Sequence, residues 1–166
     1  MSKNRKEWEI QHIANMYQSV TTISFFDTLG PDAQKFMINQ TQMTTIAVSS
    51  DYLVKLAKLK QESDASDGMM KTLANIIVFE SKVTDEEKSA CQKAGLNLYS
   101  QDEILSKGRA CDSIKDKNAV INEPSPADCS AFSYTSGTTG DPKGVKLTHK
   151  MLIGCSFAVM TRMAQT

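Results

Sequence analysis

Apolar and polar residues follow two different periods along this chain of 166 residues. Apolar positions recur at helical spacing in Glu7–Ser19, in a segment opened by Pro31 and in Leu53–Leu59. Short β-branched or aromatic runs separate them, and we expect strands there at residues 20–26, 44–48, 74–79 and 96–99. The alternation predicts an α/β fold, a parallel sheet with helices on both faces, because each crossover helix must bury its apolar stripe against the sheet.

Three helix starts are indicated by capping residues. Thr84 precedes Glu87 by three positions and Ser100 precedes Glu103 by three, which is the spacing of a capping box. The acidic cluster after Thr84 is therefore interpreted as the start of a helix and not as a pair of catalytic carboxylates. Asp51 is expected to cap the helix that carries Leu53.

The pattern also suggests how the chain is organised. Residues 1–107 are expected to form a partial α/β subdomain, with a polar loop at 61–68. Periodicity fades in 108–128, which is typical of a surface connector. Residues 129–166 then form a strand, a loop, a second strand and a helix, which we expect to be a β-hairpin and helix belonging to an incomplete domain.

Composition excludes several classes of function. Nineteen basic and nineteen acidic residues leave no net charge, and no basic stripe suits nucleic acid. Lys55, Lys58 and Lys60 are interpreted as the solvated face of a helix. The four cysteines form no C-x-x-C pair, so neither a zinc site nor a redox dithiol is expected, and a reducing, intracellular compartment fits best. The longest apolar run, Met151–Met160, falls short of the roughly 20 residues of a membrane span.

A loop rich in glycine and hydroxyl groups stands between the two strands of the expected hairpin. Residues 135–144 read Thr-Ser-Gly-Thr-Thr-Gly-Asp-Pro-Lys-Gly. Its glycines allow main-chain N–H groups to approach an anion, its hydroxyls offer further donors, and Lys143 adds a mobile positive charge. This combination favours the binding of a polyphosphate.

Two common nucleotide motifs do not fit the loop. The NTPase P-loop would place a glycine at Pro142 and a hydroxyl residue at Gly144. The dinucleotide fingerprint fails because Gly137 and Gly140 lack the third glycine at the required offset. A different phosphate loop is therefore expected.

Residues 134–144, Tyr-Thr-Ser-Gly-Thr-Thr-Gly-Asp-Pro-Lys-Gly, resemble the AMP-binding signature of the superfamily of acyl-CoA synthetases, peptide synthetase adenylation domains and luciferases. Residues 4–8 resemble the "NRPEW" element of acyl-CoA synthetases, with Lys6 in place of the proline. Residues 26–31 are similar to the "YDTLGP" stretch of the long-chain fatty acid branch. The chain thus resembles part of the N-terminal adenylation domain of a long-chain fatty acid–CoA ligase.

The resemblance implies a reaction in two steps. A fatty carboxylate attacks ATP to give an acyl-adenylate and pyrophosphate, and coenzyme A then displaces AMP. Lys143 would be the catalytic residue that stabilises the leaving pyrophosphate, and Thr135 would also contact Mg²⁺. The implied ATP-binding set is Thr135, Ser136, Gly137, Thr138, Thr139, Gly140 and Lys143.

Members of this family are several times longer, and the elements that hold adenine, ribose and the C-terminal catalytic lysine are expected outside these residues. We therefore expect no ligase activity from the chain alone, and an exposed apolar surface on the helix from Thr148 to Arg162. Thr148 is its expected N-cap, and His149 is interpreted as structural support, not as a general base. Three alternatives remain: a non-catalytic subunit, a regulatory nucleotide-binding module, or a ligase for another carboxylic acid. The expected location is cytoplasmic, or the cytoplasmic face of an organelle membrane.

Overall fold

The computed structural model describes residues 1–26, 29–111, 121–135 and 142–164. The chain divides into two compact units, each considered by itself below. Unit 1 comprises Met1–Trp8 and Phe25–Ile114, and unit 2 comprises Glu9–Ser24 and Lys115–Thr166. Residues 9–24 thus group with the C-terminal part of the chain, whereas the division drawn from the sequence kept them within 1–107. The division of the chain into functional parts at 1–107, 108–128 and 129–166 stays a prediction.

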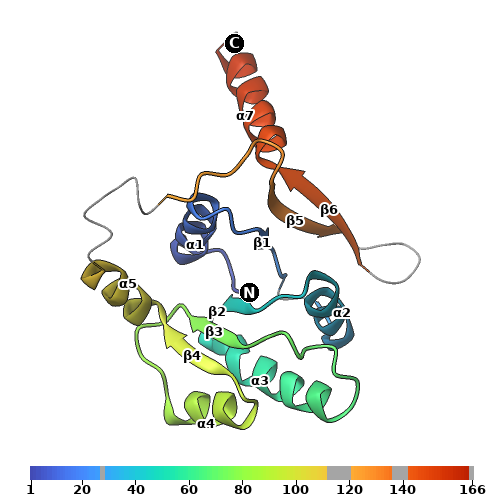
Figure 1. Cartoon of the computed structure of the whole chain (residues 1–166), viewed down its shortest axis with the longest axis vertical. Coiled ribbons are helices and arrows are strands. Elements are labelled where there is room, and N and C mark those ends of the chain that lie inside the picture. The colour runs from blue at the N-terminus through green and yellow to red at the C-terminus, as the bar shows by residue number, and fades with distance from the viewer. Residues whose placement is uncertain (27–28, 112–120, 136–141, 165–166) are drawn as a thin grey trace. The chain divides into compact units, whose positions relative to one another are not determined.

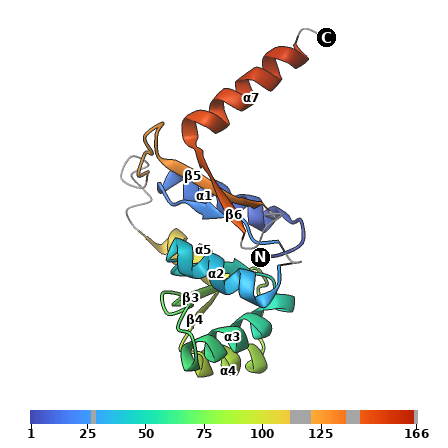
Figure 2. The same ribbon diagram turned by 90° about the vertical axis from the view of Figure 1, so that its right-hand side faces the viewer.

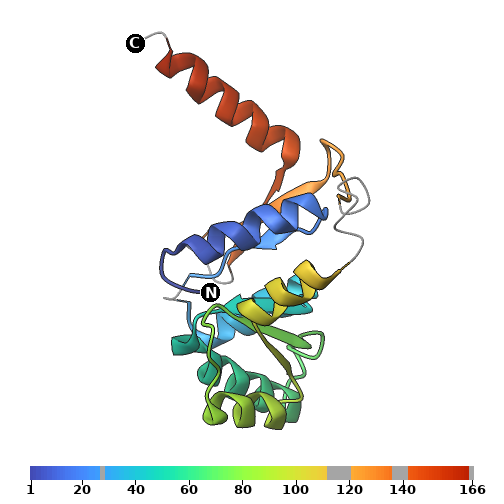
Figure 3. The same ribbon diagram turned by 90° about the vertical axis from the view of Figure 1, so that its left-hand side faces the viewer.

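Unit 1 is built on a parallel sheet of three strands in the order β2-β3-β4 (Figure 1). Its strands are β2 (Thr45–Val48), β3 (Asn75–Val78) and β4 (Asn97–Ser100). One face is covered by α3 (Ser50–Ala65) and α4 (Asp85–Lys93), and the other by α2 (Pro31–Thr41) and α5 (Gln101–Ala110), as Figures 2 and 3 show. The predicted α/β class, with helices on both faces of a parallel sheet, is confirmed.

The core of unit 1 comes from the centres of the strands and from one stripe on each of two helices. Alternate positions of the strands point into it, which is the period of two expected for β-structure. Each fully buried aliphatic side chain adds about 1.5–3 kcal/mol of transfer free energy, so this core supplies most of the driving force for folding. The buried side chains include Met37, Ile38, Ile46, Val48, Leu53, Leu56, Ala57, Ile76 and Val78.

Both predicted capping boxes are present. The Glu87 N–H donates to Thr84 Oγ1 at 3.2 Å while the Thr84 N–H donates to Glu87 Oε2 at 2.7 Å. Ser100 and Glu103 make the same reciprocal pair, at 3.2 and 2.7 Å. Each box satisfies helix N–H groups that have no partner within the helix.

The predicted cap at Asp51 is wrong. Ser49 is the N-cap of α3, and its side chain makes no capping hydrogen bond. The N–H of Ser50 instead donates to Glu80 Oε2 at 2.8 Å, and the Ser50 hydroxyl reaches the same oxygen at 3.1 Å. Glu80, two residues after β3, therefore accepts the helix N–H hydrogen bond that local spacing assigns to Asp51.

The polar loop predicted at 61–68 is also largely wrong, because α3 continues to Ala65. Ser63 is fully buried, donates to Asp67 Oδ1 at 2.5 Å and accepts the N–H of Met70 at 3.2 Å. Lys60, which was interpreted as solvated, is only 6% exposed and forms an ion pair with Asp64. Contacts between residues four to seven positions apart therefore order this polar segment.

Unit 2 contains most of α1 (Lys6–Tyr17) and a mixed sheet in the order β1-β5-β6. β1 pairs parallel with β5, and β5 pairs antiparallel with β6. The strand predicted over residues 20–26 is reduced to β1 (Thr22–Ile23). β5 (Cys129–Thr135), β6 (Lys143–Thr148) and α7 (His149–Met163) complete the unit. Within the described ranges, no helix is both long and apolar enough to cross a membrane.

Candidate functional site

The β5–β6 hairpin presents Thr135 and Lys143 as its last pair before the connecting loop. The Thr135 hydroxyl donates to the carbonyl oxygen of Lys143 at 3.4 Å, and both side chains are exposed. The predicted site residues Ser136, Gly137, Thr138, Thr139 and Gly140 lie outside the described residues. The structure therefore pairs the two residues that flank the predicted phosphate loop, Thr135 on one strand and Lys143 on the other.

Tyr134, the residue before Thr135, packs against Gly144 on the neighbouring strand. The two are cross-strand partners, and a β-carbon built on Gly144 would lie 3.3 Å from both Cε1 and Cζ of the tyrosine ring. The ring is only 6% exposed, and its burial raises the pKa of the hydroxyl above its usual value of 10.0. The buried ring therefore packs the two strands together one residue pair before Thr135 and Lys143. The sequence motif includes Tyr134 without indicating its role, although an aromatic residue opposite a glycine in a hairpin suggests cross-strand packing.

The start of α7 does not offer free N–H groups to an anion. The N–H of His149 donates to the carbonyl of Asp128 at 3.2 Å, and that of Lys150 to the carbonyl of Pro126 at 2.9 Å. The Thr148 hydroxyl accepts the N–H of Met151 at 3.3 Å, which confirms the predicted N-cap. An NTPase P-loop runs directly into a helix whose N-terminus holds phosphate. Here a strand follows the loop, and the first N–H groups of α7 already have partners, so this helix start is not an NTPase-type phosphate site.

His149 is 7% exposed, and it lies at the first position of α7. A buried histidine at a helix start that is fixed to the connector suits the structural role inferred from the sequence better than that of a general base open to substrate. The predicted role thus agrees with the place of His149 in the fold.

The connector before β5 and the first residue of β5 are hydrogen-bonded to the end of α1 and to the segment between α1 and β1. The Ser19 hydroxyl donates to the carbonyl of Asn122 at 2.7 Å, and the Thr21 hydroxyl to that of Cys129 at 2.9 Å. The N–H of Asn122 donates to the carbonyl of Tyr17 at 3.0 Å. Together with the pairing of β1 and β5, these bonds support β5 along the edge that does not pair with β6. One strand of the hairpin is therefore held on both edges.

Among the residues that the structure describes, no group of three or more histidine, cysteine, aspartate or glutamate side chains is arranged to hold a metal ion. Mg²⁺ in phosphoryl-transfer sites commonly takes most of its ligands from water and substrate phosphates, with few from protein. A hydroxyl such as that of Thr135 can supply one such oxygen.

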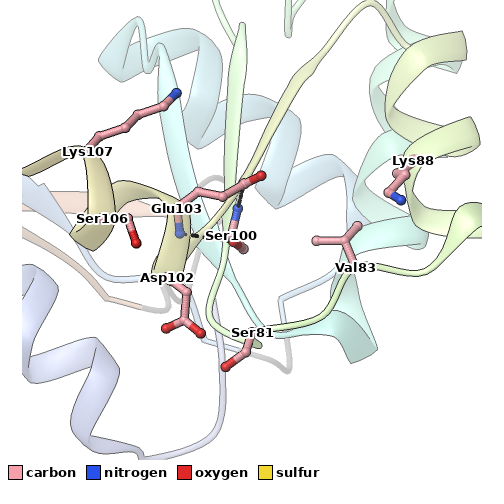
Figure 4. A pocket seen from close by; sticks show the side chains of 8 residues that line it. All are labelled: Ser81, Val83, Lys88, Ser100, Asp102, Glu103, Ser106 and Lys107. Atoms are coloured by element: carbon pink, nitrogen blue, oxygen red, sulfur yellow. Dashed lines mark hydrogen bonds between the residues drawn. The ribbon is translucent and has the colours of Figure 1, made fainter. Parts of the chain in front are cut away.

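A hollow of about 530 Å³ lies in unit 1 beyond the carboxyl end of β4 (Figure 4). Four of its polar residues already have partners within the hollow or beside it. Glu103 closes the capping box with Ser100, Lys107 lies 4.8 Å from the centre of the Tyr99 ring, and Lys88 lies 3.4 Å from Asp85. The side chains in Figure 4 do not converge on a common point, so the hollow lacks the few directed polar groups that a ligand site uses.

Comparison with known proteins identifies the family. Residues 1–165 match the family described as AMP-binding enzyme. The chain belongs to this family. It is 37% identical over 158 residues to fatty acyl-CoA synthetase B of Dictyostelium discoideum, covering 95% of this chain and 22% of the relative. It is 32% identical over 160 residues to long chain acyl-CoA synthetase 6, peroxisomal, of Arabidopsis thaliana, covering 94% and 21%. The chain thus spans about a fifth of the length of these relatives.

Solved structures agree on the fold of this AMP-binding family member. The adenylation domain of a carboxylate reductase from Mycobacterium chelonae matches with a TM-score of 0.71 and 17% identity, covering 90% of this chain and 23% of that one. A red-emitting luciferase from Phrixothrix hirtus matches with a TM-score of 0.61 and 21% identity, covering 90% and 25%. The likeness supports the adenylate-forming fold for the described elements.

Proposed function

We propose that this chain is the ATP phosphate-binding part of a long-chain fatty acid–CoA ligase. The observation that carries the proposal is the hairpin in which Thr135 and Lys143 flank the Gly- and Thr-rich loop on an anchored base. Relatives over most of the chain are named as acyl-CoA or fatty acyl-CoA synthetases, which supports fatty acid, ATP and coenzyme A as substrates of the complete enzyme. Such a protein would work inside the cell.

The first step places a fatty carboxylate oxygen on the α-phosphorus of ATP and releases pyrophosphate. The loop N–H groups and the hydroxyls of Thr135, Ser136, Thr138 and Thr139 hold the β- and γ-phosphates. Lys143 neutralises the charge that develops on pyrophosphate, a stabilisation of about 3–4 kcal/mol for a well-placed donor. In the second step the thiol of coenzyme A attacks the acyl carbonyl and AMP leaves. Mg²⁺, with Thr135 as one oxygen ligand, would screen the phosphates.

The experiment uses a chimera in which these 166 residues replace the matching segment of the Dictyostelium relative. Pyrophosphate exchange into ATP, dependent on palmitate, reports the first step. We expect the chimera to be active, and Lys143→Ala to slow exchange by about 10²–10³-fold without loss of folding, because the side chain is exposed. Lys146→Ala on the same strand, also exposed, is the matched control and should retain most of the activity.

Three results separate the alternatives. Equal rates of palmitate-dependent pyrophosphate exchange in Lys143→Ala and Lys146→Ala would contradict the proposed role of the loop. Exchange supported by an aryl or short-chain acid but not by palmitate would point to a ligase for another acid. Micromolar binding of ATP by the 166 residues alone, measured by calorimetry, would favour a regulatory nucleotide-binding module. We expect neither exchange nor tight ATP binding from the chain by itself.

A further inference from the structure

The end of the β5–β6 hairpin extends past the strand that supports its base. β1 pairs with β5 at Ala131 and Phe132, and within the described residues that ladder ends there. From Ser133 to Thr135, β5 is paired with β6. A ribbon of two strands twists more than a wider sheet and is only marginally stable by itself. The last residue pairs of the hairpin therefore require a further contact if Thr135 and Lys143 are to keep one geometry.

Two aromatic rings on β5 supply such a contact by covering the backbone of Gly144. A β-carbon built on Gly144 would lie 3.3 Å from Cε1 and Cζ of Tyr134 and 3.6 Å from Cδ1 of Phe132. Alternate residues of a strand share a face, so both rings stand on one face of β5. We name Phe132 and Tyr134 the aromatic platform. A glycine in a strand commonly marks a place of close approach, and here the approaching group is this platform.

The platform acts next to the residue that carries the charge. Gly144 directly follows Lys143, and the Thr135 hydroxyl donates to the carbonyl oxygen of Lys143 at 3.4 Å. The backbone of Lys143 is thus held from both neighbouring positions, whereas its side chain is exposed. A lysine carries its charge on a flexible stem of four carbons. The place of its backbone therefore decides which points the ammonium group can reach.

We propose that Tyr134 is a positioning residue for the first step of the reaction. Its ring, which is 6% exposed and packed on Gly144, holds the backbone of Lys143 where the ammonium group can meet the leaving pyrophosphate. This role depends on the proposed function of Lys143, and it assigns the aromatic platform a part in that function. Tyr134 acts through Lys143 and not on the reacting atoms. A misplacement of about 1 Å can slow a reaction by about 100-fold, so a small shift of this backbone is sufficient to matter.

The test measures pyrophosphate exchange into ATP, dependent on palmitate, in the Dictyostelium chimera. Tyr134→Leu should lower the maximal rate of exchange by about 10-fold and leave the KM for palmitate unchanged. Tyr134→Phe keeps the ring and should retain most of the rate. Gly144→Ala should slow exchange by about 3-fold to 10-fold, because the added β-carbon must displace the ring. Tyr99→Leu makes the same change on β4 in unit 1 and is the matched control, with an unchanged rate.

A double-mutant cycle with Lys143→Ala separates a positioning role from a merely structural one. If Tyr134 acts through Lys143, Tyr134→Leu should change the remaining rate of the Lys143→Ala chimera by less than about 2-fold. Losses of about 10-fold in both backgrounds would overturn the proposal, and so would full activity of Tyr134→Leu. If Tyr134→Leu does not fold, as judged by circular dichroism, Gly144→Ala serves in the same cycle.

Failure of the positioning role and failure of the proposed function give different results. A Lys143→Ala chimera as active as wild type would contradict the function of the loop, and the role of Tyr134 would fall with it. A slow Lys143→Ala chimera in which Tyr134→Leu still costs about 10-fold would contradict the positioning role alone.

Discussion

The ring of Tyr134 lies against the backbone of Gly144, close enough that a β-carbon on the glycine would stand 3.3 Å from two ring atoms. This contact gives the last glycine of the signature a packing role, in addition to the backbone freedom that its sequence context suggests. Because the two residues are cross-strand partners one step below Thr135 and Lys143, the contact fixes the geometry from which the loop departs.

Gly144→Val should destabilise unit 2 by about 1–3 kcal/mol, because the added methyl groups must displace a buried ring. Urea unfolding followed by circular dichroism measures the change. Gly154→Ala is the control: a β-carbon there meets no atom within 4 Å, and alanine is favoured over glycine in a helix by about 1 kcal/mol. The control should therefore be neutral or stabilising, and a Gly144→Val protein as stable as wild type would contradict the packing role.

The contact between Arg5 and Glu80 in unit 1 should weaken in acid. Arg5 Nη1 donates to Glu80 Oε1 at 2.5 Å, and the guanidinium carbon lies 5.1 Å from the centre of the Phe79 ring. Burial raises the pKa of Glu80, but hydrogen bonds from Arg5 and Ser50 outweigh it, so the net pKa lies below the ordinary 4.5. A carboxyl group with a depressed pKa in the folded state adds stability above its unfolded pKa, and this is lost as the pH falls through the folded value.

Glu80→Gln should therefore lower stability at pH 7 by about 1 kcal/mol, a modest figure because the side chain is partly exposed. It should also flatten the loss of stability below about pH 4.5. Glu62→Gln, at an exposed position of α3, is the control and should leave both unchanged. The measurement is the urea midpoint of unfolding at several pH values between about 3 and 7. If the midpoint of Glu80→Gln fell with acid as steeply as that of wild type, the contact would be refuted.

The buried cysteine should react with alkylating reagents more slowly than the exposed ones. Cys91 is 1% exposed, and burial, with a smaller contribution from the charge of Glu87, raises the pKa of its thiol to about 11. Cys111 and Cys155 are exposed. At pH 7.5 we expect alkylation of these two at least about 100-fold faster than that of Cys91, since the thiolate is the nucleophile. Mass spectrometry of timed samples measures this, and denaturant should abolish the difference. Rapid labelling of Cys91 in the folded chain would show that α4 is not packed as described.

The sequence predicted both capping boxes, but it did not predict the contacts that join distant parts of the chain. The capping boxes at Thr84 and Ser100 depend on residues three positions apart, so spacing alone predicts them. The start of α3 depends on Glu80, thirty residues away from Ser50, and no local pattern could reveal it. For the site, the motif predicted the hairpin and its flanking residues Thr135 and Lys143, but the proximity of Tyr134 to Gly144 needs the register of two strands.

Lys60 shows the same limit in a single residue. Its place among Lys55 and Lys58 suggests a solvated face, yet its stem is buried and its ammonium group meets Asp64. Long cationic side chains can lie along apolar surface while the charge finds a partner. Periodicity assigns a residue to a helix face but does not tell how far the neighbouring elements extend over it.

The pairing of β1 with β5 has a consequence for biosynthesis. The Thr21 hydroxyl and the Cys129 carbonyl that it meets are 108 residues apart, and nearly all of unit 1 is encoded between them. A ribosome therefore releases every strand of the β2-β3-β4 sheet before the partner of β1 exists, and closing so long a loop is slow. Unit 1 should therefore mature first, and residues 22–23 can pair with β5 only after residues 129–135 have been synthesised.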